Sequence, residues 1–202
     1  MEWQKDTPPA AQADATPSVD PGLPEELPTR PRALVIMHWL TVLFLIVAAT
    51  FILWRDQVDG RSPRMWLLEG HRHFGLFILL LFVARVAYRF RVGKLPAEGN
   101  TSALLRLAAG STHVALYVLL LVQPLLGWAL SSAEGKPVHF LGLTLPALVA
   151  SDEDLADTLT TWHQDVAWVL LAFIVLHAGA ALWHHFVLRD RTLRMMLPKR
   201  RR

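Results

Sequence analysis

Residues 162–188 read WHQDVAWVLLAFIVLHAGAALWHHFVL, an apolar segment in which His163 and His177 stand fourteen positions apart. Fourteen residues of α-helix end within about 40° of the starting direction and about 21 Å further along the axis. The two imidazoles therefore leave the same face of this helix, one near each end. The segment also exceeds the roughly 20 residues that a helix needs to cross about 30 Å of hydrocarbon. It predicts a membrane-spanning helix with a histidine at two depths.

Three further segments have the same apolar character, and each is close to membrane-spanning length. They run over about residues 33–54, 71–90 and 111–130. The chain is 53% hydrophobic with a mean hydropathy of +0.33, and its apolar blocks are too long for the core of a soluble domain. The sequence predicts an all-α membrane protein, built as a bundle of four transmembrane helices.

Polar segments flank this predicted membrane domain. Residues 1–30 are rich in Pro, Ala, Asp and Thr and lack hydrophobic periodicity, so we expect a disordered tail. The tail lacks a basic start followed by an apolar core, so we do not expect a signal peptide. The membrane domain is predicted over residues 31–198, followed by a basic C-terminal tail over residues 199–202.

The basic residues are unequally divided between the two sides of the four predicted crossings. Of the 20 Lys and Arg residues, 15 fall on the side that holds both termini and 5 on the other side. By the positive-inside rule, we expect both termini in the cytoplasm and the loop over residues 131–161 outside. Because the basic residues flank apolar segments, we expect membrane lipid as a partner and no nucleic acid.

These helix directions give each histidine a depth. The first segment runs outward, which places His38 near the inner surface. The second and fourth segments run inward, which places His71 and His163 near the outer surface and His177 toward the inner side. The pairs that match in depth are therefore His71 with His163 and His38 with His177. Facing imidazoles at two depths of a helix bundle are what two stacked b-type haems require. We predict two haem b groups whose iron is ligated by these four histidines.

The absence of cysteine limits the cofactor chemistry. Without cysteine the chain has no disulfide, no Cys-ligated zinc, no iron–sulfur cluster and no covalent haem attachment, so the haems are expected to bind non-covalently. A bis-histidine haem has both axial positions filled, which suits electron transfer. A zinc or copper site is the competing interpretation. Zinc gathers its ligands in one place, whereas these pairs are separated by about 20 Å of helix rise.

Two assignments at the inner end have alternatives. His113 begins the third segment at the inner surface and rivals His38 as the partner of His177. Arg85 follows His71 by fourteen residues, so it lies on the same helix face near the inner haem. It is a candidate partner for a haem propionate, because charges within a membrane usually have a partner. The alternative is that Arg85 extends its charge to the membrane interface.

Short motifs along the chain resemble those of one family. The matching stretches are MHWL at His38, HRHFG at His71, STHVALY and QPLLGW in the third segment, GLTLP at 142–146, TWHQ at His163, LHAGAALWHH at His177, and RDRTLRMM near the C-terminus. Together they cover about residues 31–198. The chain resembles the bacterial cytochrome b561 family, four-helix di-haem cytochromes of the inner membrane. The resemblance places the family's ligands on the same four histidines as the depth assignment.

This resemblance implies a function as well as a fold. It implies an oxidoreductase that takes electrons from superoxide, or from another donor at the outer face, and reduces ubiquinone. An anionic donor favours a positive surface, yet acidic residues outnumber basic ones on the predicted outer side, so a local basic region is required. The alternative function is a cytochrome b membrane-anchor subunit that carries electrons for a dehydrogenase or hydrogenase complex. A structural or transport bundle without haem is the third interpretation.

Overall fold

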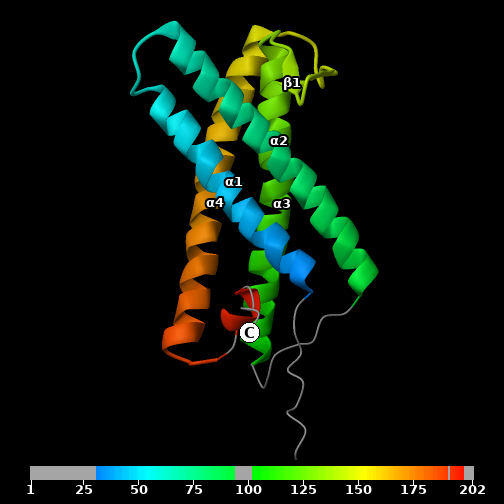
Figure 1. Ribbon diagram of the computed structural model, residues 1–202, viewed down its shortest axis with the longest axis vertical. Coiled ribbons are helices and arrows are strands. Elements are labelled where there is room, and N and C mark those ends of the chain that lie inside the picture. The colour runs from blue at the N-terminus through cyan, green and yellow to red at the C-terminus, as the bar shows by residue number, and fades with distance from the viewer. Residues whose placement is uncertain (1–30, 94–101, 191, 198–202) are drawn as a thin grey trace, which may run out of the picture.

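The computed structural model describes residues 31–93, 102–190 and 192–197. Four long helices dominate this part of the chain (Figure 1): α1 (Arg32–Arg55), α2 (Arg61–Val92), α3 (Ala103–Ala133) and α4 (Glu153–Phe186). A small antiparallel hairpin of β1 (Val138–Phe140) and β2 (Leu143–Leu145) follows α3, and a short 3-10 helix, η1 (Arg194–Met196), lies near the C-terminus. The predicted tails over residues 1–30 and 199–202 lie outside the described residues.

Three of the helices begin earlier than the apolar segments predicted. Polar side chains cap two of these earlier starts: Asp152 caps α4 by accepting a hydrogen bond from the backbone of Leu155, and Ser102 caps α3 by accepting one from Leu105. Such side chains satisfy amides that the first helical turn leaves unpaired. The predicted outer loop over residues 131–161 is therefore wrong in extent, because α3 and α4 occupy both of its ends and the hairpin occupies part of the rest. The apolar residues indicate the part of each helix that spans the lipid, whereas the helix itself continues beyond that part.

Membrane-spanning character differs among the helices. Helices α1, α3 and α4 are each long and apolar enough to cross a membrane. Helix α2 is not in this set, and it carries charged residues such as Arg72, Arg85 and Arg89. The structure therefore supports an all-helical membrane protein with three such spans among its described residues, and a crossing by α2 stays a prediction.

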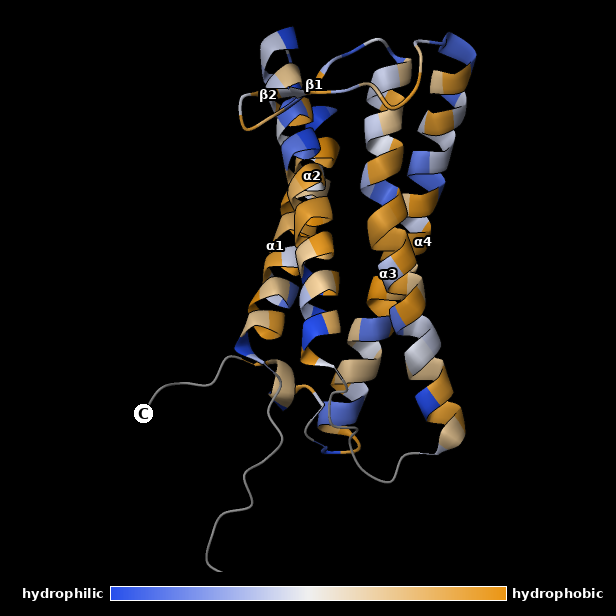
Figure 2. Cartoon of the chain, turned by 90° about the vertical axis from the view of Figure 1, so that its right-hand side faces the viewer, coloured by the Kyte–Doolittle hydropathy of each residue, from blue (hydrophilic) through white to orange (hydrophobic). Residues whose placement is uncertain are grey.

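The helices associate as two pairs. Helix α1 packs mainly on α2 and α3 mainly on α4, and the two pairs stand beside each other in Figure 2. Aromatic rings hold the first pair together: Phe44 lies 5.3 Å from Phe74, and Phe51 lies 5.7 Å from the same ring, between centroids. Gly70 makes this packing possible, because a Cβ there would lie 2.3 Å from the ring of Phe51.

Two connections join the pairs at opposite ends of the molecule. At one end Phe140 of β1 reaches across to α2, where its ring centroid lies 5.0 Å from that of Phe77. At the other end the Trp39 indole of α1 donates a hydrogen bond to the Met196 carbonyl at 2.6 Å. After α4, Asp190 pairs with His184 near the end of that helix. Burial raises the pKa of the Asp190 carboxyl, but hydrogen bonds from His184 and Thr192 outweigh it and hold that pKa below its usual value.

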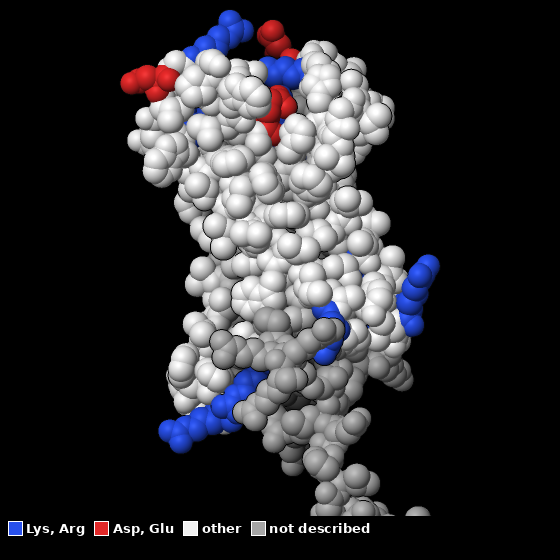
Figure 3. All heavy atoms as spheres, viewed as in Figure 1, with Lys and Arg blue, Asp and Glu red and all other residues white. Residues whose placement is uncertain are grey.

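The surface has the polarity of a membrane protein. On the face shown in Figure 3, charged side chains gather toward the two ends and leave an uncharged band between them, with acidic groups only at the upper end. Some exposed tryptophans lie near helix ends, where aromatic residues meet membrane interfaces. They include Trp54 at the end of α1, Trp66 in the second turn of α2 and Trp183 in the last turn of α4, whereas Trp168 is exposed in the middle of α4.

Candidate functional site

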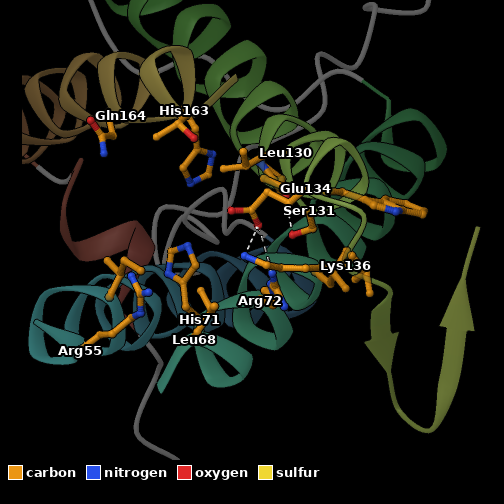
Figure 4. A pocket seen from close by; sticks show the side chains of 17 residues that line it. Arg55, Leu68, His71, Arg72, Leu130, Ser131, Glu134, Lys136, His163 and Gln164 are labelled. Atoms are coloured by element: carbon orange, nitrogen blue, oxygen red, sulfur yellow. Dashed lines mark hydrogen bonds and ion pairs between the residues drawn. The ribbon is translucent and has the colours of Figure 1, made fainter. Parts of the chain in front are cut away.

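His71 of α2 and His163 of α4 face each other between the two helix pairs. Their ring centroids are 6.0 Å apart and the ring planes stand at 86°. Both residues line a cavity of about 270 Å³, and Figure 4 shows the two imidazoles pointing toward one another across it. The structure therefore brings together the two histidines that the sequence paired at the outer end.

The protonation of His71 is fixed by its surroundings. Its Nδ1 lies 2.9 Å from the backbone oxygen of Ala48 in α1. A carbonyl oxygen only accepts hydrogen bonds, so Nδ1 carries the proton and Nε2 keeps a lone pair. A backbone carbonyl bonded to the other ring nitrogen is the usual support of a metal-ligating histidine.

Helix α3 contributes two residues against His163 that the sequence analysis did not single out. The Gln123 side-chain nitrogen lies 3.0 Å from the backbone oxygen of His163 and 3.2 Å from its ring Nε2. Gly127, one turn further along α3, lies against the same ring. The motif QPLLGW contains both, but only the pairing of α3 with α4 brings them to His163.

The cavity lining is locally positive. Arg55 of α1, Arg72 of α2 and Lys136 line it together with a single carboxylate, that of Glu134. Arg72 lies 3.7 Å from Glu134 and Lys136 lies 3.0 Å from it, so the acid that follows α3 joins Arg72 of α2 to Lys136. Arg72 also bonds Glu69 at 2.7 Å. Cations thus outnumber acids at the cavity, in contrast to the predicted outer side as a whole.

A second group of histidines lies toward the end of the bundle that the sequence predicts to be the inner one. The ring centroid of His177 in α4 is 6.3 Å from that of His38 in α1 and 5.2 Å from that of His113 in α3. The structure therefore brings the predicted pair together and brings the rival His113 to the same ring. Nδ1 of His113 lies 2.6 Å from the backbone oxygen of Ala109, which again leaves Nε2 as the basic nitrogen.

Arg85 of α2 points toward this inner group. Its guanidinium carbon lies 5.6 Å from the centroid of the Tyr117 ring, and it is close enough to His177 to interact with it electrostatically. Its Nε is buried and has no hydrogen-bond partner among the described residues. A cation in this position calls for an anionic partner, because a charge within a membrane is costly when it is unpaired.

The other histidines of the second helix and the hairpin have structural partners. His73 bonds the backbone oxygen of Glu69 at 2.8 Å and packs against Phe140, and it does not line the cavity. His139 lies 3.1 Å from the Thr144 hydroxyl across the hairpin. Of the two histidines in HRHFG, only His71 therefore faces His163.

Comparison with known proteins agrees with these features. The sequence model described as "Prokaryotic cytochrome b561" matches residues 29–199. The chain is 30% identical over 168 residues to cytochrome b561 homolog 1 of Escherichia coli (strain K12), covering 83% of this chain and 96% of that protein. It is 34% identical over 168 residues to the probable superoxide oxidase CybB of Yersinia pestis, covering 82% and 93% respectively. It is 33% identical over 172 residues to cytochrome b561 homolog 2 of Escherichia coli (strain K12), covering 80% and 87%.

The family predicted from the short motifs is thereby confirmed. The match extends over all four long helices and includes every histidine of the outer and inner groups. The chain belongs to the prokaryotic cytochrome b561 family, whose members are membrane electron-transfer proteins that bind b-type haem.

Proposed function

We propose that this chain is a di-haem cytochrome that holds one haem b between His71 and His163 and a second between His38 and His177. The observation that carries the proposal is the opposition of His71 and His163 across a cavity of about 270 Å³. Centroids 6.0 and 6.3 Å apart leave room for one metal ion between the rings of each pair, because a histidine nitrogen binds a metal at about 2 Å. The buried Arg85 guanidinium suits a propionate of the inner haem.

The proposed bundle has four crossings in the bacterial inner membrane. Helix α2 is 32 residues long, about 48 Å at the usual helical rise, and it packs along α1, which is apolar enough to span. Charged side chains on α2 that face the bundle, such as Arg85, do not prevent a crossing. The excess of basic residues near the termini supports a cytoplasmic location for both. We keep residues 31–198 as the membrane domain, with residues 1–30 and 199–202 as tails.

The proposed reaction takes electrons from superoxide at the outer face and reduces ubiquinone. Two superoxide anions give two O₂ and two electrons, and one ubiquinone takes up these electrons with two protons to give ubiquinol. The haems supply the one-electron steps. Arg55, Arg72 and Lys136 attract the anion to the outer cavity, which raises its encounter rate. The name of the Yersinia pestis relative, a probable superoxide oxidase, supports this donor at 34% identity.

The alternative function, a membrane-anchor subunit of a dehydrogenase or hydrogenase, is not favoured. The relatives described above carry the names of cytochrome b561 homologues and of a probable superoxide oxidase. Purification of the chain as a lone, active protein would separate the two functions.

The experiment that tests the proposal is a reduced-minus-oxidised spectrum of the purified protein with haem quantified per chain. We expect two low-spin b-type haems, and one in each of the variants His71→Ala and His163→Ala. A superoxide-generating system should then reduce added ubiquinone through the wild-type protein. A colourless protein, or full haem content in both variants, would refute the proposed outer site.

A further inference from the structure

One face of α3 packs against the imidazole of His163. Gln123 and Gly127 are four residues apart in α3, so they lie on the same side of the helix. Both lie against His163. The Gln123 amide is within hydrogen-bonding distance of it, and Gly127, which lacks a side chain, lets its ring approach α3 closely. His163 is therefore held from α3 as well as by its own helix.

The Gln123 amide determines which nitrogen of His163 carries the proton. Its nitrogen faces two acceptors, the backbone oxygen and the ring Nε2 of His163, and an amide nitrogen only donates. Nε2 must therefore accept with its lone pair, and the proton of the neutral ring lies on Nδ1. His71 reaches the same tautomer through Ala48. Both outer imidazoles thus have Nε2 as the basic nitrogen. The Nε2 lone pair of His163 is the one that an iron would take, so a bound iron would displace the amide from Nε2 and leave Gln123 its bond to the His163 backbone oxygen.

Gly127 determines how closely the ring approaches α3. A Cβ at this position would lie 3.1 Å from Cε1 and 3.5 Å from Nδ1 of His163. Carbon atoms in optimal contact are about 3.5–4.0 Å apart, so an alanine would force the imidazole away from α3. Gly110 offers a contrast in the same helix, because no described atom lies within 4 Å of a Cβ built there.

We propose that Gln123 and Gly127 are positioning residues for the outer haem ligand. Gln123 anchors the backbone of His163 through its carbonyl oxygen, and Gly127 sets the distance of the ring from α3. The inference rests on the proposed outer haem between His71 and His163. Since both residues act through His163, their signature is in the potential and spectrum of one haem rather than in catalytic rate alone.

The first test replaces the amide and keeps the side-chain length. We expect Gln123→Met to retain two haems per chain, because the four ligands remain. The midpoint potential of the outer haem should shift, because His163 loses the hydrogen bond that holds its backbone, and its imidazole can change orientation against the iron. Its low-spin electron paramagnetic resonance signal should also move. The outer signal is identified as the one that His71→Ala removes. The control is Gln57→Met, which changes a glutamine that lies just after α1 and does not line the cavity.

The second test uses the glycines and does not depend on the stability of Gln123→Met. Gly127→Ala should displace the outer-haem signal, whereas Gly110→Ala should leave both haems as in wild type. Unchanged potential and resonance of the outer haem in both Gln123→Met and Gly127→Ala would overturn the inference. If His71→Ala removes no haem from the wild-type complement, the proposed outer site fails instead, and the inference fails with it.

Discussion

His177 has two imidazole neighbours, His38 from α1 and His113 from α3. One iron takes two axial ligands, so only one of these neighbours completes the inner site. The longer centroid separation, 6.3 Å to His38, leaves more room for a metal ion than the 5.2 Å to His113. We therefore keep His38 as the proposed ligand, with His113 as a neighbour of the haem.

Single substitutions decide this choice. His38→Ala should lower the haem content from two per chain to one, whereas His113→Ala should keep two, as measured by the pyridine haemochrome assay on purified protein. His73→Ala is the control, because His73 packs against Phe140 outside the cavity. The reverse result for His38 and His113 would assign the inner ligand to α3.

Arg85 should raise the potential of the inner haem. A nearby cation favours the reduced iron, which carries one positive charge less, so Arg85→Gln should lower the inner midpoint potential. Redox titration of the visible spectrum measures it. Arg89→Gln is the matched control, because Arg89 donates instead to the backbone oxygen of Gly93 at the end of α2. Equal shifts in the two variants would contradict a specific role for Arg85.

The pairing of α1 with α2 depends on one missing side chain. Gly70 faces Phe51 so closely that a Cβ would lie 2.3 Å from the ring, well inside any contact distance. Phe51 in turn packs on Phe74, so a displaced ring disturbs the aromatic contacts that join the two helices. Because His71 is the next residue after Gly70, this contact also sets where α2 places its histidine.

We expect Gly70→Ala to destabilise the protein. Overpacking of a well-filled contact costs about 1–3 kcal/mol, which outweighs the gain of up to about 1 kcal/mol from replacing glycine in a helix. The measurement is the thermal midpoint of the detergent-solubilised protein. Gly110→Ala, at an open position of α3, should raise or preserve that midpoint. Replacing the Phe51 ring by a smaller side chain, in Phe51→Leu, should partly restore the thermal midpoint of Gly70→Ala. If it does not, the destabilisation of Gly70→Ala has another cause.

The molecule as a whole combines an apolar middle with two charged ends that differ in sign. Acidic groups gather at the upper end in Figure 3, yet the cavity at that end is lined by three cations and one carboxylate. The cations come from α1, α2 and the segment after α3, so this local charge exists only in the assembled bundle. It is the basic region that an anionic donor requires.

The rate of superoxide oxidation should therefore depend on salt. Arg55→Gln combined with Lys136→Gln should slow ubiquinone reduction by superoxide roughly 3- to 10-fold at low ionic strength. The difference from wild type should shrink at high salt, where charges are screened within about 10 Å or less. Arg194→Gln, at the opposite end of the molecule, is the control. Equal rates at all salt concentrations would refute attraction of the donor by these residues.

The sequence by itself determined the apolar helices, the family, and which histidines share a helix face and a depth. Helical periodicity and hydrocarbon thickness are local rules, and the spacing of His163 and His177 obeys both. The polar first turns of α2 and α4 escaped the prediction because hydropathy does not detect helix beyond the lipid. The hairpin that carries Phe140 to α2 escaped it because that contact joins residues far apart in the sequence.

Only the tertiary structure decided which residues of different helices meet. The contact of Gln123 and Gly127 with His163 depends on the pairing of α3 with α4, and no period within α3 specifies it. The approach of both His38 and His113 to His177 likewise depends on how α1 and α3 lie relative to α4. The positive cavity lining arises in the same way, from Arg55, Arg72 and Lys136 on separate elements. Helix packing is set by side chains distant in the sequence, whereas the direction of a residue within its own helix is set by its neighbours.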